Sequence, residues 1–114
     1  MEKTELEKRL IELPKQIASA MGVIVDTQIE KGDVETKIEE IKVAVSFQVG
    51  TNTDLKNDTA RRAAIADLLN QNVAYTKLLD SQKTITLKLE HARIEYQMNR
   101  DMLNVLIAVV GMGK

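Results

Sequence analysis

Cysteine and tryptophan are absent from this sequence of 114 residues, and proline occurs once, at Pro14. Without cysteine, disulfide bonds, thiolate catalysis and cysteine-ligated metal sites are excluded. Aromatic residues make up only 3% of the chain: Phe47, Tyr75 and Tyr96. So few rings offer little for stacking nucleic-acid bases or for a core of bulky aromatic side chains.

Neither sign of charge is in excess, because 16 Lys and Arg residues oppose 17 Asp and Glu residues, giving a net charge of −1. Such a chain has no long-range attraction to nucleic acid or to an anionic membrane. Apolar residues make up 44% of the chain. We therefore expect a single small folded domain over residues 1–114.

Long hydrophobic runs are also lacking, and the longest lies near the carboxyl end, where Asn104 is the only polar residue from 102 to 110. About nine residues are too few for a transmembrane helix, which needs about 20. The opening stretch, MEKTELEKRLIELPKQ, has mixed charge and no apolar signal core. The sequence predicts a cytoplasmic protein without a transmembrane segment.

The first half of the chain has an apolar track in which the spacing alternates between three and four residues. This spacing predicts one edge of a long helix, about residues 3–48, as in coiled coils. Thr27 and Lys31 interrupt the track, and Pro14 predicts a break or kink near it. The track comprises Leu6, Leu10, Leu13, Ile17, Ala20, Ile24, Thr27, Lys31, Val34, Ile38, Ile41 and Val45.

Two more helices are predicted after the turn-like stretch VGTNTDLKND. A short one covers about 58–70, with Asn57 or Asp58 as its cap and a narrow apolar stripe of Ala64, Ile65, Leu68 and Leu69. A long one covers about 73–110, with Asn72 as its cap. Its track comprises Tyr75, Leu78, Gln82, Ile85, Leu89, Ala92, Tyr96, Asn99, Leu103, Leu106 and Val110.

Residues 41–49 and 84–90 also alternate apolar and polar residues as a half-buried strand does. We favour helix, because both runs continue the longer tracks, but a pair of strands is the alternative interpretation. A helix over 73–110 would be about 57 Å long and needs a partner of similar length. The short connection makes the two long helices antiparallel, and we place Ile24 opposite Gln97.

The sequence thus predicts an all-α fold of two long antiparallel helices joined by a short helix, a coiled-coil-like helical bundle. Apolar residues surround the axis of the last helix near its end, and such a helix needs neighbours on several sides. A second copy of the chain is the simplest source of these neighbours, so we expect a homo-oligomer. The alternative interpretation of this end is a terminal helical layer. The predicted oligomer seam comprises Met21, Ile24, Leu103, Leu106, Ile107 and Val110.

Residues that could carry chemistry are few. His91 is the only histidine, and it lies between Glu90 and Glu95 without the Glu-x-x-His pairs of helical di-metal sites. The sequence contains no P-loop and no GxSxG motif. We expect no catalytic residue, no metal site and no cofactor, and a protein that is not an enzyme.

The only basic cluster is Lys56, Arg61 and Arg62, at the start of the short helix. One interpretation is structural, with Arg61 held against the carboxylates of Asp54 and Asp58. The other is a contact with a phosphate or an acidic partner, including single-stranded DNA.

The run KNDTARRAAIADLLNQNVAYTKLL, with Asn57, Arg61 and Tyr75 at its key positions, resembles small coiled-coil proteins of bacteriophages and prophages. The resemblance covers most of the chain. It implies a largely uncharacterised phage protein that sometimes accompanies recombination genes, and it transfers no catalytic residue. Two hypotheses follow: an accessory factor in DNA recombination, or an inhibitor or adaptor that binds a host or phage protein.

Overall fold

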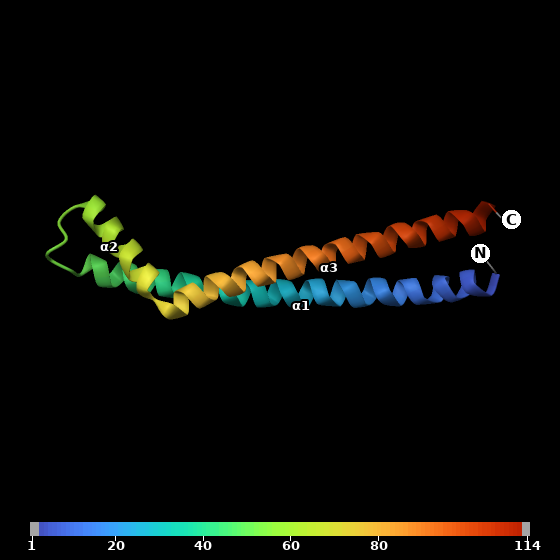
Figure 1. Ribbon diagram of the computed structural model, residues 1–114, viewed down its shortest axis with the longest axis horizontal. Helices are drawn as coiled ribbons and strands as arrows, with labels where there is room; N and C mark the ends of the chain where they lie inside the picture. Colours follow the sequence, from blue (N-terminus) through green and yellow to red (C-terminus); the bar gives the residue numbers. More distant parts are fainter. Residues whose placement is uncertain (1–2, 113–114) are drawn as a thin grey trace. The chain divides into compact units, whose positions relative to one another are not determined.

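The computed structural model describes residues 3–112, which form three helices and, within that range, no strand (Figure 1). They are α1 (Lys3–Gly50), α2 (Asp58–Gln71) and α3 (Val73–Met112). The predicted all-α fold is confirmed, and the helix ends lie within two residues of the expected positions. The alternative of strands at 41–49 and 84–90 is wrong, because both runs are helical.

Helix α1 continues through Pro14 without interruption, so the expected break there does not occur. Proline removes one backbone hydrogen bond and crowds the preceding turn, which weakens a helix. Here Pro14 is exposed, while its neighbour Leu13 is only 4% exposed and the residues one turn to either side, Leu10 and Ile17, are half-buried. Side-chain packing on both sides of the proline holds the helix together across it.

The chain divides into two compact units. We call residues 1–29 and 87–114 the terminal unit, of which 3–29 and 87–112 are described. Residues 30–86 are the turn unit. Helices α1 and α3 contribute to both units, and α2 belongs to the turn unit alone.

In the terminal unit, α1 and α3 run antiparallel, with the start of α1 and the end of α3 at the same end (Figure 1). Between the two helices, Ile24 of α1 packs with Leu89 and Ala92 of α3, and Tyr96 packs against this cluster. The expected pairing of Ile24 with Gln97 is therefore wrong by about one heptad. A 3-4 pattern looks the same after a shift of seven residues, so the tracks alone do not determine register.

The turn unit consists of the second part of α1, the loop 51–57, α2 and the first part of α3. Ile38, Val45, Val49 and Ile85 are its buried apolar residues. Helix α2 has no fully buried residue. Its predicted stripe, Ala64, Ile65, Leu68 and Leu69, is half-buried.

The caps of the turn unit are those that the sequence predicts. The Asn57 side chain accepts a hydrogen bond from the amide of Ala60 at 2.7 Å, and Asn72 accepts one from the amide of Tyr75 at 2.8 Å. Each bond satisfies an amide that has no partner within its own helix. The two asparagines therefore fix where α2 and α3 begin.

Both predicted tracks are confirmed as the buried edges of α1 and α3. Every position in each track is buried or half-buried, from Leu6 to Val45 and from Tyr75 to Val110. Most other residues of the two helices are exposed. Each long helix thus uses one narrow edge inside the chain and leaves its remaining faces to solvent or to another molecule.

Candidate functional site

His91 is exposed on α3. Among residues 3–112, no group of three or more His, Cys, Asp or Glu side chains is placed to hold a metal ion. No described helix is long and apolar enough to cross a membrane. The structure presents three features that could carry function: the basic cluster, the polar positions in the seam and the exposed apolar faces.

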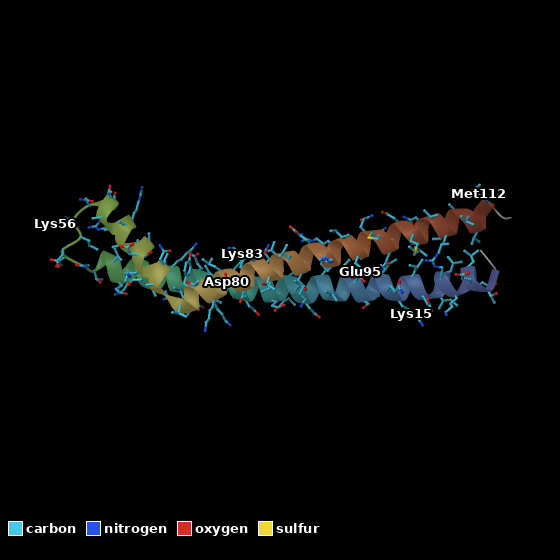
Figure 2. All side chains as sticks on the ribbon, viewed as in Figure 1. Lys15, Lys56, Asp80, Lys83, Glu95 and Met112 are labelled. Carbon is cyan, nitrogen blue, oxygen red and sulfur yellow. The ribbon has the colours of Figure 1, made fainter. Side chains whose placement is uncertain are left out.

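In the basic cluster, Arg61 is bound to its own loop. Its Nε donates a hydrogen bond to the carbonyl oxygen of Leu55 at 3.1 Å, and its guanidinium lies 3.8 Å from the Asp58 carboxylate. The contact with Asp58 agrees with the structural interpretation of Arg61. The shorter contact of Arg61, however, is the one to the backbone carbonyl of Leu55. Lys56 and Arg62 are exposed, with Lys56 on the loop between α1 and α2 (Figure 2).

The polar interruptions of the α1 track are satisfied on α1 itself. Thr27 is 1% exposed, and its hydroxyl donates to the carbonyl oxygen of Val23 at 2.6 Å. Lys31 lies 3.9 Å from the Glu35 carboxylate, one turn along the helix. Both partners therefore lie on α1 itself, one turn of helix away from each side chain.

The six residues of the predicted oligomer seam fall into two groups. Ile24 and Leu106 are buried, at 7% and 5% exposed, and Leu103 and Val110 are half-buried within the chain's own seam. Met21 and Ile107 are exposed, at 41% and 55%. Of the six residues, only Met21 and Ile107 are exposed at the surface of the chain.

The largest exposed apolar face runs along α3 in the terminal unit. At 100° per residue, its side chains fall within an arc of about 80°, well away from the buried edge of the helix. His91 is the one polar residue within this arc. We call this face the α3 outer stripe: Leu87, Ile94, Met98, Met102, Val105, Val109 and Met112, which are all 37% exposed or more.

The α3 outer stripe carries no charge along its length, and Met112, at its carboxyl end, is 86% exposed (Figure 2). Near its middle, Met102 accepts a hydrogen bond from the guanidinium of Arg9 at 3.3 Å. Sulfur is a weak acceptor, so this contact holds Met102 only loosely. Unbranched methionine side chains adapt to different neighbours, which suits a binding surface.

Helix α1 has a smaller set of exposed apolar side chains. In the terminal unit, Ile11, Val25 and Ile29 are 46–62% exposed. In the turn unit, Val43 and Phe47 line an open apolar hollow with Glu39 and Glu40 at its edge. These residues are spread over the two units, whereas the α3 outer stripe is continuous within one.

The accessible surface of the chain is 8474 Å². A compact monomer of 12.8 kDa exposes about 6,300 Å². The excess is about 2,200 Å² per chain. Twice this area, for two chains, lies within the range of total surface that obligate dimers bury. The chain therefore exposes as much extra surface as a stable dimer would cover.

Comparisons with protein-family models, curated proteins and solved structures gave no match for this chain. Functional inference consequently comes from the exposed surfaces alone. The sequence predicts the apolar end of α3, and the structure shows that exposed apolar side chains continue from there back to Leu87. A signal was present, because these residues recur with the 3.6-residue period of a straight helix, beside the 3.5-residue period of the seam.

Proposed function

We propose that the protein is a non-enzymatic helical assembly protein that self-associates through exposed apolar helix faces. The observation that carries this proposal is the α3 outer stripe, seven large apolar side chains on one face of a long helix with no covering segment among residues 3–112. Contiguous exposed apolar patches of this kind mark binding surfaces in soluble proteins.

The narrow seam supports the same proposal. In the terminal unit, the fully buried apolar side chains lie along a single seam between the two helices: Leu13, Ala20, Ile24, Leu89, Ala92 and Leu106. Pairs of helices with so thin a core gain little from burial and commonly need further helices for stability. A second pair of helices would supply the missing neighbours.

Sedimentation equilibrium of the purified chain over a concentration series tests the proposal. We expect a mass above the 12.8 kDa of one chain that rises with concentration. A mass of 12.8 kDa at every concentration would contradict it. Far-ultraviolet circular dichroism of the same samples checks that the chain is helical throughout.

Contact with single-stranded DNA, as for an accessory factor in recombination, is the second candidate. It rests on exposed Lys56 and Arg62 beside the loop-bound Arg61. A gel shift at several salt concentrations tests it, because phosphate binding weakens steeply as salt rises. Absence of binding at low salt would leave the assembly role and, with it, an adaptor for a host or phage protein.

A further inference from the structure

We infer that the α3 outer stripe is the surface on which a second copy of this chain docks, with the two α3 helices antiparallel. This inference rests on the proposed function and names the surface and orientation of the assembly. Three observations carry it: the pattern of the stripe, the charges beside it and the excess accessible surface of 8474 Å² against about 6,300 Å².

Six of the seven residues of the α3 outer stripe fall opposite another stripe residue when the stripe is turned end over end, and Val109 falls opposite His91. A two-fold axis between Met98 and Met102 places these methionines against each other across the interface. The same operation brings Ile94 to Val105 and Leu87 to Met112. Closed dimers use one self-complementary patch in this way, in which residue i meets residue j and j meets i.

The charges at the edges of the stripe favour the antiparallel orientation. A parallel pair would place Glu90 of each chain at the same interface edge as Glu95 of the other chain, and like charges in contact destabilise an interface. In the antiparallel pair, the two Glu95 residues are about 14 Å apart along the axis, at 1.5 Å per residue. Asp101 is the edge carboxylate nearest the axis, and it is the one that approaches its own copy in the antiparallel pair. In each chain the side-chain amide of Gln97 donates to this carboxylate at 2.8 Å.

The first experiment introduces charge into the stripe. Ile94→Lys and Val105→Glu change side chains that are 59% and 61% exposed, so we expect both variants to keep their helical circular dichroism. Each substitution buries two unpaired charges in the dimer. We expect the Kd of self-association to rise about 100-fold or more, measured by sedimentation velocity.

The double variant Ile94→Lys/Val105→Glu tests the orientation. Within one chain the two positions are about 16 Å apart along α3, so the new charges do not meet there. In an antiparallel dimer each introduced lysine meets an introduced glutamate, and we expect the Kd to recover at least tenfold relative to either single variant. A double variant that is weaker than both single variants would overturn the antiparallel arrangement.

The matched control is Ile29→Lys on α1, where the isoleucine is 61% exposed. We expect its Kd to stay within about threefold of the wild-type value, since it lies off the stripe. If Ile29→Lys dissociates the assembly and Ile94→Lys does not, the α1 face is the interface and this inference is wrong, while the proposed function stands. A wild-type chain that is monomeric at every concentration would refute both.

Cross-linking gives the orientation independently of affinity, because the chain has no cysteine of its own. Chains carrying Leu87→Cys are mixed with chains carrying Met112→Cys and oxidised. An antiparallel dimer yields mixed disulfides between the two variants. Preferential pairing of each variant with itself would indicate a parallel pair and overturn the inference.

Discussion

The terminal unit and the turn unit place their large apolar side chains differently. Within residues 3–112, thirteen of the sixteen exposed large apolar side chains belong to the terminal unit and three, Val43, Phe47 and Val73, to the turn unit. Both units contain the same two long helices with the same seam pattern. The difference therefore lies in the outer faces of the helices and not in the seam.

The turn unit instead contains several local hydrogen bonds made by polar side chains. Asn57 and Asn72 cap two helices, Arg61 binds a loop carbonyl, and the Asn52 side chain accepts a hydrogen bond from the amide of Asp54. Such bonds define where helices begin and how the chain reverses. The turn unit therefore contains the hydrogen bonds that define the helix ends and the chain reversal, and the terminal unit contains most of the exposed apolar surface.

The largest expected effect is on the free energy of unfolding, and it distinguishes two leucines of the terminal unit that lie two residues apart. Leu89 is 3% exposed and Leu87 is 63% exposed. We expect Leu89→Ala to lower the free energy of unfolding by about 2–5 kcal/mol, because it leaves a cavity in the core layer. Leu87→Ala should change it by about 0.5 kcal/mol or less in dilute solution.

Urea denaturation followed by circular dichroism at low protein concentration measures both variants. Repeating it at high concentration sharpens the comparison, since Leu87 lies in the α3 outer stripe and its loss should then destabilise the assembled chain. Equal losses for the two variants at low concentration would show that exposure does not distinguish the two sides of α3.

The second expected effect is a smaller loss of stability, from removing a helix cap in the turn unit. Asn57→Ala removes the acceptor for the Ala60 amide, and we expect it to lower the free energy of unfolding by about 1 kcal/mol. Asn70→Ala, an exposed position inside α2, is the control and should have no comparable cost. The same denaturation assay applies. A loss in self-association with Asn57→Ala but not in stability would reverse the roles assigned to the two units.

The smallest effect compares one glycine from each unit. A methyl group added at Gly22 in the terminal unit, or at Gly32 in the turn unit, meets nothing within 4 Å. We expect Gly22→Ala and Gly32→Ala each to raise the free energy of unfolding by up to about 1 kcal/mol through helix propensity. A gain at Gly32 with a loss at Gly22 only at high concentration would show that a second chain approaches α1 closely at Gly22.

The sequence was sufficient to predict which residues line the buried edge of each long helix, down to the polar positions Thr27, Gln82 and Asn99. This is because the 3-4 spacing is a property of the helix itself and persists through Pro14 and Gly32. The caps Asn57 and Asn72 were predictable for the same reason, since an N-cap bond spans only three residues.

Register was not predictable from the tracks. A slide of seven residues leaves every seam position of α1 facing a seam position of α3, so Ile24 can face residues near Gln97 or near Leu89 and Ala92 with the same pattern. What distinguishes these arrangements is the number of residues in the turn and the packing of α2. Those depend on contacts between segments that sequence periodicity does not describe.

The role of Arg61 and the extent of the α3 outer stripe were also incompletely predicted. Charge complementarity suggested carboxylate partners for Arg61, whereas its shortest bond is to the carbonyl of Leu55, which only the path of the loop brings near. The stripe was obscured because its residues interleave with the seam. Only the exposed fractions of the structure separate Leu87 from Leu89.

The repeating seam has a consequence for how such a chain can change in length. Inserting seven residues into α1 and seven at the facing level of α3 would return every later side chain to an equivalent position, with the turn untouched. The seam of the two long helices can therefore be lengthened or shortened in steps of seven residues without a change in which side chains are buried.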